Sequence, residues 1–137
     1  MVEAALNKIL EDHDIQPSAH RLAVAAFVLD NTSHPSADEV WTGVSATFPM
    51  ISRATVYNTL NLFVRNGLVS ELHLSEGKVV FDPNIGRHHH FIDEETGAIH
   101  DIPWEQIQVC NIESLKNFVV SDYQVVVRGK RRRRART

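Results

Sequence analysis

Five residues have side chains that commonly bind a hard or borderline metal ion: His34, Asp82, His88, His90 and Asp101. Three imidazole nitrogens and two carboxylate oxygens suit Fe(II), Mn(II) or Zn(II), and none of these ions needs a thiolate. If the segment around them is a strand, His88 and His90 point to one face and His89 to the other. A run of histidines can also be a solvated patch, so the site depends on the elements that position it.

In the first half of the chain, apolar spacing predicts four helices, over about residues 2–12, 18–31, 36–47 and 52–66. Ser36 with Glu39 has the capping-box pattern, and Ser52 and Gly67 are typical residues at a helix start and just past a helix end. Two strands, over residues 68–74 and 79–82, follow as a hairpin. Helices followed by a hairpin indicate a winged helix-turn-helix over residues 1–83, with the hairpin as the wing.

For the second half of the chain we predict a linker, residues 84–86, followed by a small domain, residues 87–128. Its predicted strands cover residues 88–93, 98–102 and 119–127, with one helical turn near 113–117. A three-stranded sheet of this size is too small to stand alone in water, so we expect it to complete its core against a second copy of the chain. The predicted fold is α+β: an N-terminal winged helix-turn-helix plus a small C-terminal α/β dimerisation domain.

Composition is that of a globular protein, with 43% apolar and 23% charged residues. No apolar run approaches the roughly 18 residues of a membrane span, and the N-terminus lacks a secretory signal pattern. The lone Cys110 excludes an intrachain disulfide, and we interpret it as a half-buried structural residue. We therefore expect a cytoplasmic protein with no membrane contact.

The net charge of −3 hides an asymmetry along the chain. Seven of the fourteen cations lie at the end: Arg128, Lys130, Arg131, Arg132, Arg133, Arg134 and Arg136. Residues 1–127 therefore carry −10, which disfavours non-specific DNA binding, since phosphate contacts need Lys or Arg. We expect residues 129–137 to form a disordered basic tail. It could contact DNA, RNA or a membrane surface, or be a solvated end without a role.

The fourth predicted helix is amphipathic, with Val56, Leu60 and Phe63 on its apolar face. Its polar residues suit a DNA major groove, where Arg and Tyr contact phosphates and Asn can read an adenine edge. An ordinary solvated face is the alternative, but the preceding helices and the wing favour DNA. The predicted DNA-binding residues are Ser52, Arg53, Thr55, Tyr57, Asn58, Asn61 and Arg65.

Residues 51–60 (ISRATVYNTL) and 67–69 (GLV) closely resemble the recognition helix and the start of the wing in the ferric uptake regulator (Fur) family. Residues 34–40 (HPSADEV) are similar to that family's preceding helix. The resemblance spans about residues 15–101. It implies a homodimeric, metal-dependent repressor that binds palindromic operator DNA and is not an enzyme. It also implies that the five ligand candidates form the regulatory site, where one ion would join the two domains.

Two departures from the family pattern concern metal chemistry. Most members of that family carry two CxxC pairs that bind a structural zinc. In this chain the residues from Asp93 to Thr96 occupy the place of the first pair, and there is no second pair. We therefore expect no structural zinc bound by four cysteines. The aspartates 82 and 101 resemble the ligands of peroxide-stress regulators (PerR). That subgroup implies that bound Fe(II) reacts with hydrogen peroxide, which oxidises His34 or His88 and releases DNA.

Two alternatives stay open. Residues 125–128 (VVVR) are similar to the iron response regulator (Irr) subgroup, which implies a response to iron or haem with residues 88–90 as the haem contact. The Cys-Pro pair usual in haem-regulatory motifs is missing, because Asn111 follows Cys110. A metallohydrolase is disfavoured, since five ligands leave little open coordination and no base or nucleophile stands nearby.

Overall fold

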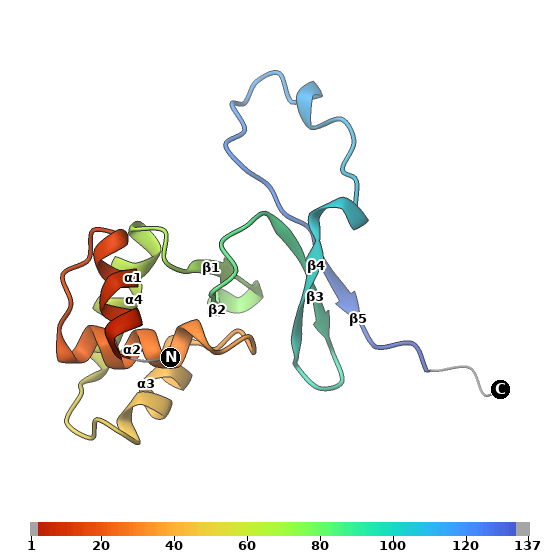
Figure 1. Cartoon of the computed structure of the whole chain (residues 1–137). Helices are drawn as coiled ribbons and strands as arrows, with labels where there is room; N and C mark the ends of the chain where they lie inside the picture. The colour runs from red at the N-terminus through yellow and green to blue at the C-terminus, as the bar shows by residue number, and fades with distance from the viewer. Residues whose placement is uncertain (1–2, 134–137) are drawn as a thin grey trace. The chain divides into compact units, whose positions relative to one another are not determined.

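The computed structural model of the chain describes residues 3–133. The fold is mixed, with four α-helices and two small sheets among these residues, which confirms the α+β class (Figure 1). The chain divides into two compact units: an N-terminal unit, Met1–Ile85, and a C-terminal unit, Gly86–Thr137. Within the described residues, the helices are too short or too polar to cross a membrane.

The N-terminal unit contains the four predicted helices and the predicted hairpin. They are α1 (Glu3–Asp12), α2 (Ala19–Leu29), α3 (Ala37–Ser45), α4 (Arg53–Arg65), β1 (Ser70–His73) and β2 (Val79–Asp82). The predicted start of the first helix at Val2 lies outside the described residues. The caps are confirmed: Ser36 and Glu39 form a complete capping box, and the Ser52 hydroxyl accepts the backbone N–H of Thr55. Gly67 follows the last helix with φ +74°, a conformation that glycine adopts without strain.

The core of this unit lies between α2, α3 and α4. Val24, Val40, Val56, Leu60 and Phe63 are fully buried there. Burial of each such side chain contributes roughly 1.5–3 kcal/mol. This packing fixes which face of α4 is inward and leaves the opposite, polar face exposed.

The C-terminal unit is a three-stranded sheet in the order β4-β3-β5, with strands β3 (His88–Asp93), β4 (Ile99–Pro103) and β5 (Val126–Gly129). Strand β4 runs antiparallel and β5 parallel to β3 (Figure 1). Two short 3-10 turns, η2 (Trp104–Gln106) and η3 (Ile112–Ser114), lie in the long connection between β4 and β5.

Two expectations about this unit are wrong. The last strand begins at Val126 and residues 119–125 are irregular, because a run of apolar residues indicates a strand but its start depends on where pairing with β3 begins. The N–H of Val125 donates to the imidazole of His89 instead of to a strand backbone. Cys110 is exposed, not half-buried, because it lies in the irregular segment between η2 and η3.

Candidate metal centre and DNA-reading helix

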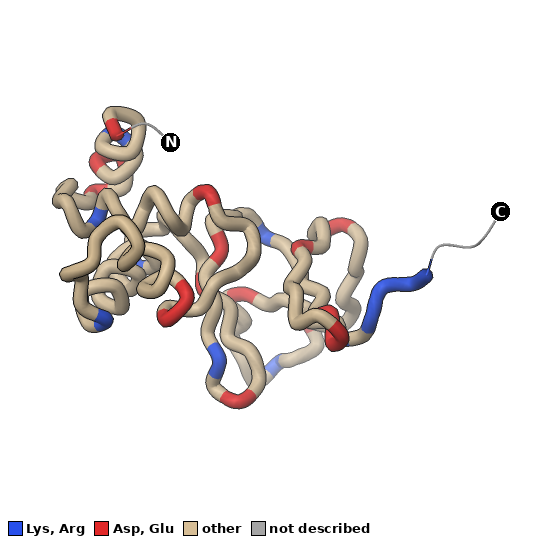
Figure 2. The backbone as a smooth tube through the Cα atoms, turned by 90° about the horizontal axis from the view of Figure 1, so that it is seen from below, with Lys and Arg blue, Asp and Glu red and all other residues tan. Residues whose placement is uncertain are grey.

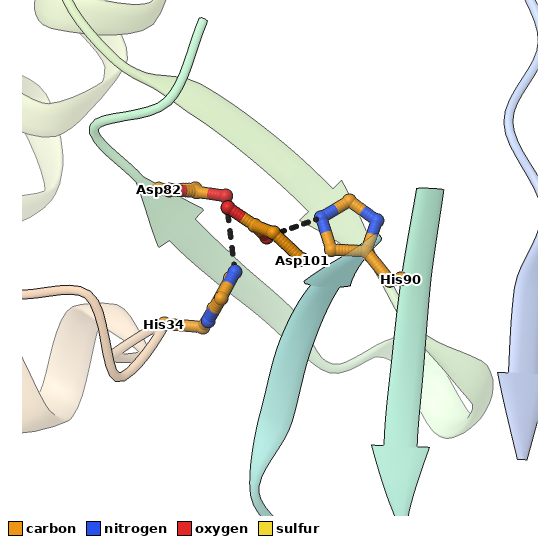
Figure 3. Close-up of side chains that lie close together, drawn as sticks. All are labelled: His34, Asp82, His90 and Asp101. Atoms are coloured by element: carbon orange, nitrogen blue, oxygen red, sulfur yellow. Dashed lines mark hydrogen bonds and ion pairs between the residues drawn. The ribbon is translucent and has the colours of Figure 1, made fainter. Parts of the chain in front are cut away.

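His34 and Asp82 meet inside the N-terminal unit although 48 positions separate them. The His34 Nε2 atom lies 3.0 Å from Oδ2 of Asp82 (Figure 3). A backbone hydrogen bond brings them together, since the N–H of Phe81 donates to the carbonyl of Pro35 at 2.9 Å. The end of the β1–β2 hairpin is therefore attached directly to the loop that precedes α3.

This pair is almost completely shielded from solvent, with each side chain 3% exposed. His34 has φ +60°, in the left-handed region that non-glycine residues rarely adopt, and such positions cluster at functional sites. The second oxygen of Asp82 accepts the N–H of Asn84 at 2.9 Å. A buried carboxylate needs such donors or a cation, so the pair fits one side of a metal site.

Three further predicted ligands converge within the C-terminal unit. The register of β3 and β4 places His90 opposite Asp101. The Nε2 atoms of His88 and His90 lie 3.4 and 3.5 Å from the same Asp101 oxygen, Oδ1. Figure 3 shows the His90–Asp101 contact. Two imidazoles and one carboxylate thus point at a common position, which is the donor chemistry that a divalent transition metal requires.

His89 lies on the opposite face of β3 and is fully buried. Its Nδ1 accepts the N–H of Val125 at 2.9 Å, and its ring stacks on Trp104 with ring centroids 4.5 Å apart. The bond holds the chain beside β3 just before β5 begins. His89 is therefore a positioning residue for the strand that carries His88 and His90. Alternation along a strand indicates its face, but nothing in the sequence points to Val125 as its partner.

Asp93 closes the turn after β3. Its carboxylate accepts the backbone N–H of Glu95 at 2.9 Å and that of Thr96 at 3.3 Å. These hydrogen bonds hold the pKa of Asp93 below its usual value, and the bond from Glu95 has the largest effect. Hydrogen bonds therefore close this turn, and a zinc site of four cysteines cannot be built from the single cysteine of the chain.

The predicted DNA-binding residues lie on and just before α4. One of them, Thr55, is half-buried. The other six are exposed: Ser52, Arg53, Tyr57, Asn58, Asn61 and Arg65. Two of these side chains contact α3. The Tyr57 hydroxyl donates to Asp38 at 3.1 Å, and the guanidinium of Arg53 lies 3.4 Å from the same carboxylate. The sequence analysis missed Asp38, because no spacing rule connects it with α4.

Comparisons with known proteins agree on one family. The sequence model of the ferric uptake regulator family matches residues 6–128. The chain is 31% identical over 122 residues to the peroxide-responsive repressor PerR of Staphylococcus aureus (strain Mu50 / ATCC 700699), covering 88% of this chain and 82% of that protein. It is 35% identical over 111 residues to PerR of Staphylococcus epidermidis, covering 81% and 72%.

Solved structures show the same likeness. The ferric uptake regulator of Vibrio cholerae matches with a TM-score of 0.66 and 25% identity, covering 90% of this chain and 98% of the other. That of Pseudomonas aeruginosa, solved with manganese, matches with a TM-score of 0.69 and 25% identity, covering 97% and 100%. The resemblance seen in the sequence is thus confirmed, and the chain belongs to the ferric uptake regulator family of metal-responsive transcription regulators.

Proposed function

We propose that this protein is a metal-dependent, peroxide-sensing repressor that binds palindromic operator DNA as a homodimer. The observation that carries the proposal is the presence of two small sets of metal-type donors. One is the buried His34–Asp82 pair of the N-terminal unit, and the other comprises His88, His90 and Asp101 of the C-terminal unit. Neither set alone fills the coordination sphere of Fe(II) or Mn(II).

We infer that one divalent cation is bound by both sets. The carboxylates of Asp82 and Asp101 carry two negative charges, which would neutralise the ion, and the three imidazoles supply neutral nitrogen ligands. This donor set suits Fe(II) or Mn(II), and Zn(II) is acceptable. An ion shared by both units would tie them together and favour the arrangement in which the α4 helices of a dimer match their operator.

The peroxide response is supported by the PerR relatives and by the aspartates at positions 82 and 101. Fe(II), when bound, supplies the redox chemistry that activates hydrogen peroxide. In the proposed reaction one ring carbon of His34 or His88 gains an oxygen atom, and the other peroxide oxygen leaves as water. The oxidised ring is a poorer ligand, so the units separate and DNA is released.

The homodimer is supported by the small core of the C-terminal unit. Ile92 and Ile99 are its buried hydrophobic residues within the described chain, at 9% and 8% exposure. In contrast, Phe118 and Val119 are 71% and 98% exposed. A sheet with so little buried apolar area gains stability when a second copy covers such residues.

Metal-dependent DNA binding is the direct test. A duplex selected from a random pool by Mn(II)-loaded protein should bind the full chain between about 5- and 150-fold more tightly with Mn(II) than with a chelator, the usual range for coupled sites. Fluorescence anisotropy measures the affinity, and sedimentation velocity of the same samples measures whether the protein is a dimer. Equal affinity with and without metal would contradict the proposal.

The basic tail is proposed to supply DNA phosphate contacts that the N-terminal unit lacks. Residues 1–85 contain five Lys or Arg against ten Asp or Glu. Figure 2 shows the described cations of the tail, Lys130–Arg133, as one continuous segment. Eight residues follow Gly129, and a fully extended chain of that length reaches about 26 Å. The tail can therefore contact phosphates some distance from the sheet.

Truncation after Gly129 should weaken binding to every duplex alike. The slope of log affinity against log salt concentration should become shallower by about 0.9 for each phosphate that the tail no longer neutralises. A full-length variant with glutamine at the tail cations is the matched control for chain length and should behave like the truncation. If the truncated protein keeps the original salt slope, the tail has no role in DNA binding.

A further inference from the structure

A carboxylate on α3 contacts two predicted DNA-binding side chains of α4. The Tyr57 hydroxyl donates to Oδ1 of Asp38 at 3.1 Å, and Nη1 of Arg53 lies 3.4 Å from that same oxygen. The guanidinium of Arg53 also lies over the ring of Trp41, 4.6 Å from its centroid. Arg53 is thus held by an anion and an aromatic face, both of which belong to the neighbouring helix.

Asp38 lies in the first turn of α3, where an acid stabilises a helix by roughly 0.3–1 kcal/mol, but its ion pair with Arg53 adds little to the stability of the fold. The side chains of Arg53 and Asp38 are 61% and 56% exposed, and exposed ion pairs add little to stability. An acid beside the DNA-reading face also repels phosphates, in a unit that already has more acids than bases. We therefore expect Asp38 to oppose binding to any duplex, so a gain in DNA recognition would have to come from the side chains that it contacts.

We propose that Asp38 is a specificity-determining positioning residue. It holds Arg53 and Tyr57 in one conformation before binding, so that their contacts fix the register of α4 on the duplex, and its charge disfavours binding to non-cognate DNA. Ordering long side chains before binding lowers the entropic cost of cognate contacts. The negative charge acts against all duplexes, so only those that gain from the ordered side chains overcome it. This inference rests on the proposed DNA-binding function.

The contact itself can be tested without DNA. The hydrogen bond to the Asp38 carboxylate raises the pKa of Tyr57. The chain has two tyrosines, so the Tyr123→Phe variant leaves Tyr57 as the sole tyrosine in an absorbance titration. Adding Asp38→Asn should lower the pKa of Tyr57, because the charged acceptor is removed. An unchanged titration would show that the contact does not form in solution and would overturn the inference.

The effect on specificity needs two duplexes, the selected operator and a scrambled sequence, with metal-loaded full-length protein. Asp38→Asn should bind the scrambled duplex more tightly than the parent does. Its preference for the operator should fall about threefold to tenfold, the cost of ordering one or two long side chains. Asp38→Glu should retain most of the preference. Glu11→Gln is the matched control, because it removes one charge from an exposed residue of α1 in the same unit.

The outcomes separate this inference from the proposed function. If Asp38→Asn and Glu11→Gln both keep the original preference, or if Asp38→Asn strengthens binding to both duplexes equally, Asp38 does not determine specificity. If the parent protein shows no metal-dependent DNA binding, the proposed function fails, while the Tyr57 titration still decides whether Asp38 holds that side chain.

Discussion

Alanine at His90 or at Asp101 should abolish the metal dependence of DNA binding. Both residues belong to the C-terminal donor set, in which one Asp101 oxygen lies within 3.5 Å of two imidazole nitrogens. Loss of one ligand should weaken Mn(II) binding by about 100-fold or more, since even the partners that orient ligands contribute 10- to 100-fold. Titration calorimetry measures Mn(II) affinity, and operator binding in Mn(II) should match that in a chelator.

His100→Ala is the matched control, because His100 precedes Asp101 on β4 and lies near the ring of Phe91, with ring centroids 6.4 Å apart. It should leave Mn(II) affinity and operator binding unchanged. If His90→Ala and Asp101→Ala both keep metal-dependent binding, the C-terminal donor set is not the regulatory site.

The stoichiometry of the titration tests whether one ion joins the two units. A shared ion predicts one Mn(II) for each chain, and His34→Ala should weaken the same binding event as Asp101→Ala. Two independent ions would instead give two events, each abolished in only one of the variants. That result would retain metal binding but contradict the proposed link between the units.

Stoichiometric hydrogen peroxide should add one oxygen atom to Fe(II)-loaded protein and release it from DNA. Mass spectrometry of a digest should place the added oxygen on a peptide that contains His34 or His88. The Mn(II)-loaded protein is the control and should be unchanged, because Mn(II) does not readily supply the electrons that activate peroxide. Unmodified histidines together with intact DNA binding after treatment would exclude peroxide as the signal.

A haem-responsive regulator is the alternative in that case. It predicts that hemin titration shifts the Soret band through residues 88–90. The structure gives this alternative little support, since His89 lies on the opposite face of β3 and is fully buried. The run therefore does not present three imidazoles to one side of the strand.

Local patterns determined a large part of this fold. Ser36, Glu39 and Ser52 cap their helices because a side-chain oxygen within three residues can satisfy an exposed N–H at a helix start. His88 and His90 share a face because side chains alternate along a strand. The function of each domain and the predicted boundary between them stay predictions.

Tertiary contacts decided the rest. A hydrogen bond from the N–H of Phe81 to the carbonyl of Pro35 brings His34 beside Asp82. The imidazole of His89 accepts a hydrogen bond from the N–H of Val125, in a segment where apolar residues had predicted a strand. The pairing of Asp38 with α4 depends in the same way on how two helices pack. By itself the sequence determined which residue types are present, where helices end and which face of a strand a side chain occupies. The last two depend only on neighbours a few positions away. Only the folded chain decided which distant side chains meet, because those distances depend on packing that no local pattern contains.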